Sequence, residues 1–178
     1  MSKVLILVGH PDLSRSKHNA ALLDGVKDLD HVTVHDLYAA YPDFAVDGDA
    51  ERDLITQHDV IVFQHPMHWY NTTPLFQQWQ DTVLTYDWAF NYEGRRSRTA
   101  GKKALVAVTI GGTQDHYTYE GLVGRTTEEL LNNWDSTLRL CQFDVQPVFK
   151  LYGTAFGVPH EDIVTAGKQY RALLTSFS

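Results

Sequence analysis

The sequence is poor in sulfur and has no long apolar or basic segment. Its one cysteine, Cys141, excludes an internal disulfide and suits a reducing compartment. The longest apolar runs are about seven residues, too short to span a bilayer. The run from Val4 to Val8 is followed by His10-Pro11, so we expect no secretory leader. No cluster of lysine and arginine suits a long phosphate backbone, which argues against nucleic-acid binding.

The composition is that of a folded, acidic protein. The chain has 178 residues, of which 43% are hydrophobic and 21% charged, as in an ordinary globular domain. The formal net charge is −7, and the acidic residues are spread along the chain. Because no repeat, low-complexity segment or linker divides the sequence, we expect a single domain over residues 1–178 and a cytoplasmic location.

Short apolar segments alternate with helical patterns. Residues 3–9 are nearly all apolar, as expected for a strand covered on both faces. The apolar runs within residues 59–65 and 104–109 predict two further buried strands. Residues 31–37 alternate in polarity, and residues 145–151 form a fifth candidate strand that contains a proline. Between these strands, apolar residues recur at helical spacing, as at Leu75, Trp79 and Val83. After the last strand, an amphipathic C-terminal helix is predicted by the spacing of Ile163, Ala166, Tyr170, Leu173 and Leu174. The pattern predicts five strands separated by helices.

Strands that alternate with helices pair in parallel through right-handed crossovers. Five strands in a chain of this length predict an α/β fold of the flavodoxin-like type. We therefore expect a three-layer sandwich with a five-stranded parallel sheet in the order 2-1-3-4-5. Two helix starts are also marked: Thr73 precedes Pro74, and Thr126 with Glu129 resembles a capping box.

In such a sheet, ligands bind beyond the carboxyl ends of the strands, at the switch in strand order. The first segment there, residues 10–19, leads into a helix whose free N–H groups suit a phosphate. Ser16 and Asn19 offer side-chain donors, and Arg15 and Lys17 add positive charge. The alternative interpretation is ordinary helix capping by Ser16 or Asn19.

The second segment, residues 65–73, carries Met67, Trp69 and Tyr70. These apolar side chains could form a surface for a planar heterocycle. The alternative is a hydrophobic plug between the loop and the core. The two histidines of this segment have no third ligand nearby, so we expect no metal.

The third segment, residues 109–119, begins with a strand end and Gly111-Gly112. Glycines let the backbone approach a ligand and turn N–H groups toward developing negative charge. Tyr117 or His116 could stand over a bound ring. The alternative is a simple turn, in which paired glycines are common. Together the three segments provide a phosphate site, a ring slot and backbone donors, which match the three parts of flavin mononucleotide (FMN).

Several short motifs lie in the same order as in a known family. They are His10-Pro11 with Ser16 and Asn19, Tyr41-Pro42-Asp43-Phe44, Gln64-His65-Pro66-Met67-His68-Trp69-Tyr70, Trp88–Tyr92 before Gly101-Lys102, and Thr109-Ile110-Gly111-Gly112. With these motifs the chain resembles the flavodoxin-like NAD(P)H:quinone oxidoreductases over nearly its whole length. It is most similar to the bacterial branch that includes the ancillary proteins of glutathione-regulated potassium efflux.

The resemblance implies a bound flavin, a homodimer and two-electron reduction of quinones or related acceptors by NADH or NADPH. The cofactor-binding residues that it implies are His10, Ser16, Lys17, His18 and Asn19 on the phosphate side, and Met67, His68, Trp69, Tyr70, Thr109, Ile110, Gly111 and Gly112 around the isoalloxazine ring. Tyr117 matches the catalytic tyrosine of the larger members. Their catalytic histidine falls near Val123, so we expect a ping-pong cycle without a tyrosine–histidine relay.

Three further interpretations follow. The short chain lacks an adenine-binding extension, which favours FMN over FAD. Arg95, Arg96 and Arg98 either meet the 2′-phosphate of NADPH or form a solvated loop cluster. The alternative function is a regulatory subunit of a membrane potassium-efflux transporter, peripheral at the inner face of the membrane. A phospho-receiver domain is disfavoured, because the third strand ends Gln64-His65 and not in an acidic residue.

Overall fold

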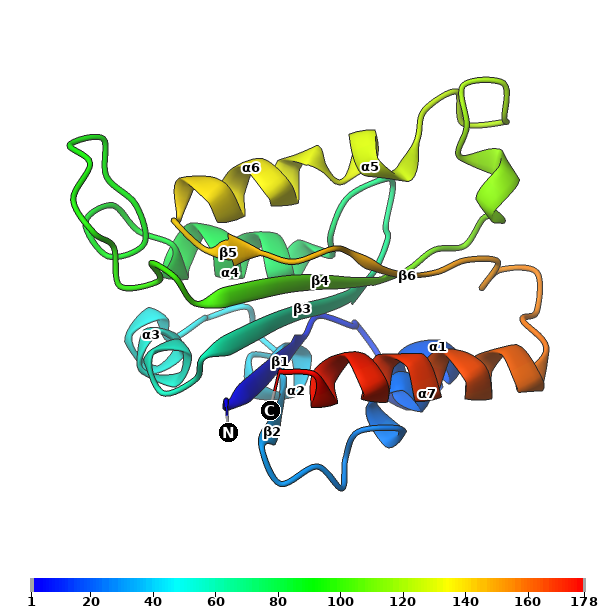
Figure 1. Cartoon of the computed structure of the whole chain (residues 1–178), viewed down its shortest axis with the longest axis horizontal. Helices are drawn as coiled ribbons and strands as arrows, with labels where there is room; N and C mark the ends of the chain where they lie inside the picture. Colours follow the sequence, from blue (N-terminus) through cyan, green and yellow to red (C-terminus); the bar gives the residue numbers. More distant parts are fainter. Residues whose placement is uncertain (1, 178) are drawn as a thin grey trace.

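The computed structural model describes residues 2–177, in which a parallel sheet lies between two groups of helices (Figure 1). The strands are β1 (Val4–Val8), β2 (Val32–Asp36), β3 (Val60–Pro66), β4 (Lys103–Thr109), β5 (Asp144–Val145) and β6 (Phe149–Leu151). The α-helices are α1 (Lys17–Asp24), α2 (Leu37–Ala40), α3 (Gly48–Thr56), α4 (Pro74–Val83), α5 (Thr127–Leu130), α6 (Asn132–Leu140) and α7 (His160–Thr175). Two 3-10 turns are η1 (Leu13–Arg15) and η2 (Gln114–His116).

The strand order is β2-β1-β3-β4-β5, with β6 also pairing with β4. All these pairs are parallel. The predicted flavodoxin-like order is therefore confirmed. It places the carboxyl ends of β1 and β3, where the strand order switches, next to each other. Within the described part of the chain, no helix combines the length and apolarity needed to cross a membrane.

The fifth position of the sheet holds two short strands, so the continuous strand expected over residues 145–151 was wrong. β5 pairs with the start of β4 and β6 with its end. Pro147 stands between them, and a proline has no N–H to donate to the ladder. The edge of the sheet is therefore interrupted at this residue.

Alternate residues of the central strands face opposite layers. Leu5 and Leu7 of β1 pack in the cluster that contains Leu75, Trp79 and Val83 of α4, the stripe expected from their spacing. This face of the sheet is covered by α4 and α6 (Figure 1). Met67, in the loop that joins β3 to α4, packs against this core layer.

The opposite face of the sheet is covered by α1 and α7 (Figure 1). Val4 and Ile6 of β1 point into this layer and pack with Ala166, Tyr170 and Leu174 of α7. These three residues of α7 lie on one face of the helix at spacings of four residues. The pattern confirms the predicted amphipathic C-terminal helix.

Both marked helix starts are present, but one works differently from the expectation. In α5, Thr126 Oγ1 accepts from the Glu129 N–H at 3.2 Å, and the Glu129 carboxylate accepts from the Thr126 N–H at 2.9 Å, so the capping box is confirmed. Thr73 is the N-cap residue of α4, yet its side chain makes no cap bond. Its hydroxyl donates to the Gly9 carbonyl at 2.9 Å, which ties the start of α4 to the end of β1.

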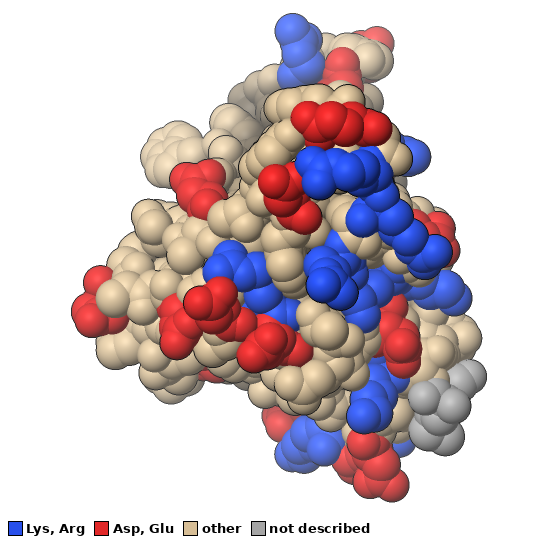
Figure 2. All heavy atoms as spheres, turned by 90° about the vertical axis from the view of Figure 1, so that its left-hand side faces the viewer, with Lys and Arg blue, Asp and Glu red and all other residues tan. Residues whose placement is uncertain are grey.

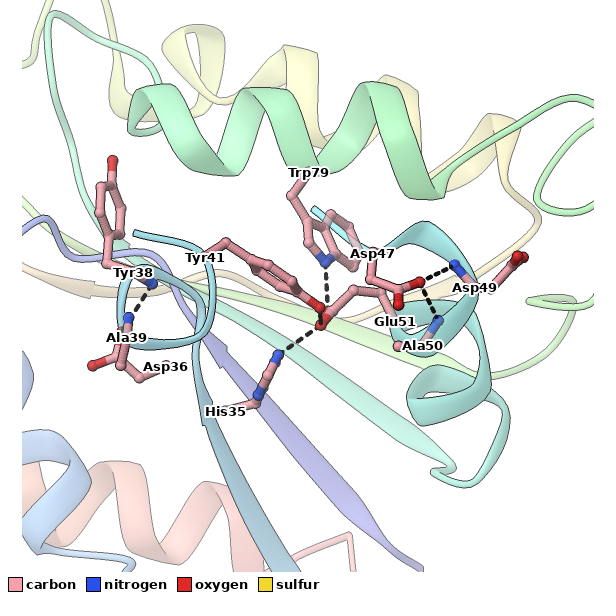
Figure 3. Close-up of polar contacts among 10 residues, drawn as sticks. All are labelled: His35, Asp36, Tyr38, Ala39, Tyr41, Asp47, Asp49, Ala50, Glu51 and Trp79. Carbon is pink, nitrogen blue, oxygen red and sulfur yellow. Dashed lines mark hydrogen bonds and ion pairs between the residues drawn. The ribbon is translucent and has the colours of Figure 1, made fainter. Parts of the chain in front are cut away.

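A buried carboxylate holds α3 against its neighbours (Figure 3). His35 Nε2 of β2 lies 2.7 Å from Glu51 Oε1, and the Tyr41 hydroxyl donates to the same oxygen at 2.7 Å. The indole N–H of Trp79 donates to Glu51 Oε2 at 2.7 Å. Burial disfavours the charged carboxylate, but the bonds from His35, Trp79 and Tyr41 outweigh it and lower the pKa of Glu51. The charge therefore links β2, α3 and α4.

Candidate functional site

Loops gather at the carboxyl edge of the sheet, as expected. The N–H of Met67, after β3, donates to the Thr109 carbonyl of β4 at 2.8 Å. A further loop, after β6, was not foreseen: the N–H of Gly153 donates to the Gly112 carbonyl at 2.8 Å, and that of Ala155 donates to the Gly111 carbonyl at 3.1 Å. The segment after β4 is therefore held from both sides.

A line of buried polar side chains runs from α7 through β3 and α1 to the end of β4. Asn19 Nδ2 donates to Thr109 Oγ1 at 2.9 Å, and Gln64 Nε2 donates to Asn19 Oδ1 at 3.2 Å. The Tyr170 hydroxyl donates to Gln64 Oε1 at 2.8 Å. All four residues are buried. Since Asn19 accepts from Gln64 through Oδ1, it must present its N–H to Thr109, and the Thr109 hydroxyl proton is directed elsewhere.

The start of α1 combines capping with free donors. Ser16 is the N-cap residue, and its Oγ accepts from the Asn19 N–H at 3.1 Å, so the capping interpretation holds for Ser16. Lys17 is exposed and His18 is half-buried. Within residues 2–177, the backbone N–H groups of Lys17 and His18 have no acceptor. Such groups at a helix start attract an anion.

His10 is half-buried beside this helix start. Its Nδ1 accepts from the Asp12 N–H at 3.1 Å, so the neutral ring carries its proton on Nε2. Burial is the largest cause that lowers the pKa of His10, and the electrostatic influence of His68, from the loop after β3, lowers it further. His10 is therefore a neutral donor at pH 7.

The loop after β3 contains a strained turn. His68 and Asn71 exchange two backbone hydrogen bonds of 2.9 Å, with Trp69 at φ 48° and Tyr70 at φ 66° between them. Positive φ at both central positions defines a type I′ turn, which normally takes Asn or Gly. Trp69 is 92% exposed and Tyr70 45%, so neither plugs the core. Of the three apolar side chains of this segment, only Met67 packs against the core. Backbone strain without a packing reason is typical of ligand sites.

Thr72 directly follows this turn and has a buried hydroxyl. Its Oγ1 has no hydrogen-bond partner among the described residues, although the residue is only 7% exposed. An unsatisfied buried hydroxyl costs about 1–3 kcal/mol. A bound polar group at this loop would supply the missing partner.

Tyr117 lies over the glycines that follow β4. A Cβ on Gly112 would come within 2.8 Å of Tyr117 Cε2, so only glycine fits beneath the ring. Burial raises the pKa of Tyr117, and its hydroxyl therefore keeps its proton at neutral pH. The Tyr152 ring centroid lies 5.9 Å from that of Tyr117. Ile110 is buried, and the Gly111 N–H has no acceptor among the described residues.

His65 belongs to the core and not to the site. Its Nε2 accepts from the Trp134 indole N–H at 3.0 Å, and its Nδ1 lies 3.0 Å from the Pro66 carbonyl, to which it donates. Burial lowers the pKa of His65 to about 4, so the ring is neutral. Within residues 2–177, no group of histidine, cysteine and acidic side chains could hold a metal ion.

Sequence reasoning missed four residues of this region: Gln64, Thr72, Tyr152 and Tyr170. Gln64 left a signal, because it is a polar residue that directly follows the apolar run Val60–Phe63 within the same strand. Tyr170 was assigned only to the apolar face of its helix, and nothing local shows that its hydroxyl reaches β3. Thr72 and Tyr152 lie in loops without a distinguishing pattern.

A doubly wound parallel sheet in this strand order, with loops gathered at its switch point, defines the flavodoxin-like class of α/β proteins. The model of the flavodoxin-like fold family matches residues 2–174, and the chain belongs to this family. It is 37% identical over 152 residues to the NAD(P)H oxidoreductase YrkL of Bacillus subtilis, covering 85% of this chain and 86% of the relative.

Two further proteins extend the comparison. The potassium-efflux ancillary protein KefF of Enterobacter sp. is 36% identical over 171 residues, covering 96% of this chain and 94% of that protein. The structure of general stress protein 14 from Treponema denticola in complex with FMN matches with a TM-score of 0.90 and 34% identity, covering 99% of each chain. The expected resemblance to NAD(P)H oxidoreductases and efflux ancillary proteins is confirmed.

Proposed function

We propose that the protein is an FMN-dependent NAD(P)H oxidoreductase that reduces quinones or related acceptors. The observation that carries the proposal is the strained Trp69–Tyr70 turn, whose exposed aromatic rings have no packing role. It lies in the same group of loops as the free N–H groups of α1 and the Tyr117 hydroxyl. The T. denticola relative, which was solved with FMN, supports FMN over FAD.

The residues present fit such a cofactor. The N–H groups of Lys17 and His18, with neutral His10, would hold the phosphate. Trp69 and Tyr70 would flank the ring, and Thr72 would gain the partner that its hydroxyl lacks. The Gly111 N–H and the Thr109 hydroxyl would donate to polar atoms at the ring edge.

Bound FMN would supply the redox chemistry, accepting a hydride from NAD(P)H and passing it to a quinone. Tyr117 would donate a hydrogen bond to the quinone oxygen that gains negative charge, and a proton from solvent completes the hydroquinone. Since nicotinamide and quinone would use the same crevice in turn, the oxidised nicotinamide must leave before the quinone enters. This order predicts ping-pong kinetics.

An absorbance spectrum of the purified protein, with mass spectrometry of the released flavin, tests the cofactor. Initial rates with NADPH or NADH and menadione then test the reaction, for which parallel double-reciprocal lines are expected. A protein that is colourless and does not bind added FMN would refute the proposal. If the protein binds FMN but does not reduce menadione, it is a flavin-binding protein and the proposed enzymatic activity is refuted.

The KefF relative favours a second role, as a peripheral subunit of a potassium-efflux transporter on the cytoplasmic side of the membrane. Recovery of the protein with inner membranes only when such a transporter is present would support this role.

The homodimer also belongs to the proposal. Tyr86 and Tyr92 are 45% and 78% exposed, and exposed aromatic side chains are common in subunit interfaces. Sedimentation equilibrium would distinguish a dimer from a monomer.

A further inference from the structure

A polar hollow of about 540 Å³ lies at the amino ends of β3 and β4. Its lining residues are Asp59, Arg96, Ser97, Arg98, Ala100, Gly101 and Lys102. β4 is seven residues long, so roughly 20 Å of sheet separates this hollow from the loops at the carboxyl edge. The hollow is therefore distinct from the candidate flavin site of the same chain.

The loop that forms the hollow is fastened from within. The Ser97 N–H donates to Gln142 Oε1 at 3.1 Å, and Thr99 Oγ1 bonds the carbonyls of Ala89 and Cys141. Ser97 and Thr99 are buried. Arg96 and Arg98 alternate with them and are exposed. The two guanidinium groups are therefore presented to solvent by a loop whose backbone is fixed.

Arg96 and Arg98 have no ion-pair partner among the described residues. The adjacent Arg95 differs, because it pairs with Asp87 and Glu93. Asp87 and Glu93 are thus close to this loop, yet they pair only with Arg95, which does not line the hollow. Two uncompensated positive charges converge on one cavity in a chain of net charge −7.

A third positive charge lies at the edge of the hollow. Lys102 Nζ donates to the carbonyls of Thr56 and His58, which fixes the ammonium in place, and the nearby Asp59 carboxylate compensates part of its charge. Asp59 is the one acidic lining residue, and one of its carboxylate oxygens accepts from the Lys3 N–H at 2.8 Å. Figure 2 shows Lys and Arg side chains gathered in the middle of this face of the molecule.

We propose that this hollow binds the phosphate monoester of a small molecule. Guanidinium groups bind phosphate through paired hydrogen bonds, and a monoester carries about −1.5 to −2 charges at pH 7, which suits two arginines and a lysine. The net charge of −7 opposes approach to an anionic membrane and favours a free molecule over a lipid headgroup. The 2′-phosphate of NADPH bound at the carboxyl edge of the same chain would lie too far away.

The test is a titration of the full-length protein with inorganic phosphate, followed by ¹H–¹⁵N NMR. We expect saturable shifts of the amides of residues 96–101. The double variant Arg96→Ala/Arg98→Ala should bind phosphate at least tenfold more weakly. The control Arg139→Ala/Lys168→Ala removes two exposed charges elsewhere and should bind within about twofold of wild type.

The proposal is overturned if these amides do not shift. It is also overturned if both double variants lower the affinity for phosphate equally, as a general charge effect would. Cosedimentation with phosphatidic acid vesicles separates the two sources of a phosphate group. Binding to the vesicles that exceeds binding to free phosphate and is lost in the Arg96/Arg98 variant would overturn the small-molecule assignment. Absence of vesicle binding, with the amide shifts present, would support it.

Discussion

Trp69 and Tyr70 adopt a backbone conformation that costs about 1–2 kcal/mol for each residue other than glycine. The turn would form more easily with Asn-Gly, the pair preferred by type I′ geometry. Yet the aromatic side chains gain little burial in return, because Trp69 is 92% exposed. The protein therefore carries local strain at the edge where we place the flavin ring.

The double variant Trp69→Asn/Tyr70→Gly separates strain from binding. We expect the free energy of unfolding of the flavin-free protein to rise by about 1 kcal/mol as the strain is relieved. The affinity for FMN should fall at least tenfold, because the ring loses its aromatic contacts. Urea unfolding and fluorescence titration measure the two effects. A misfolded variant could not become more stable, and unchanged FMN affinity would show that the turn does not hold the ring.

Tyr117 provides a second test at the residue scale. Tyr117→Phe keeps the ring above Gly112 but removes the hydroxyl, which the raised pKa keeps protonated. We expect kcat/KM for menadione to fall about tenfold, the value of one hydrogen bond of about 1.4 kcal/mol, with FMN binding and Tm unchanged. The exposed Tyr119→Phe serves as the control. Equal activity of the two variants would remove Tyr117 from the mechanism.

Among the elements, α7 has a role that its amphipathic pattern does not reveal. Its Tyr170 hydroxyl begins the buried line of donors that passes through Gln64 and Asn19 to Thr109. Each side chain fixes the orientation of the next. The helix therefore supports the site from the face of the sheet that it shares with α1.

Tyr170→Phe should leave Gln64 Oε1 buried without a donor and lower the free energy of unfolding by about 1–3 kcal/mol. Because Asn19 then loses its fixed orientation, FMN affinity should also fall, whereas a purely structural role would change stability alone. Urea unfolding and FMN titration compare this variant with Tyr119→Phe, a residue that is 64% exposed. Reduced stability with wild-type FMN affinity would mean that these hydrogen bonds stabilise the fold but do not orient the FMN site.

Element boundaries were predictable where local chemistry decides them and not elsewhere. The capping box of α5 needs only residues 126–129, and it is present. The break at Pro147 also had a local sign, but its result, two short strands, depends on where α6 and β4 hold the chain. The Thr73 hydroxyl bonds Gly9, 64 residues away, and no helix-start pattern carries that information.

At the scale of the whole molecule, the sheet order was predictable because buried strands and crossover helices leave few arrangements. The candidate site was predictable in part, since the switch point selects loops without any knowledge of contacts. The loop after β6 was not, because its bonds to Gly111 and Gly112 use backbone groups that every sequence has. Nor was the bond between Gln64 and Tyr170, which are 106 residues apart.

Buried histidines should make global stability fall in mild acid. The pKa of His65 is about 4 in the folded protein and about 6.5 in an unfolded chain. Between these values the unfolded chain binds more protons, so the free energy of unfolding rises with pH and is lost as pH falls through this window. Burial lowers the pKa of His10 and His18 in the same direction.

From pH 7.5 to pH 5, His65 alone should remove about 2 kcal/mol from the free energy of unfolding. The lowered pKa of Glu51 acts mainly below this range, where ordinary carboxyl groups titrate. Urea unfolding of His65→Gln at both pH values should show a smaller loss than wild type, even if the variant is less stable at each. The exposed His160→Gln should match wild type. An equal loss in His65→Gln would mean that His65 is not held neutral by its contacts with Trp134 and Pro66, and that the acid sensitivity of the molecule has another source.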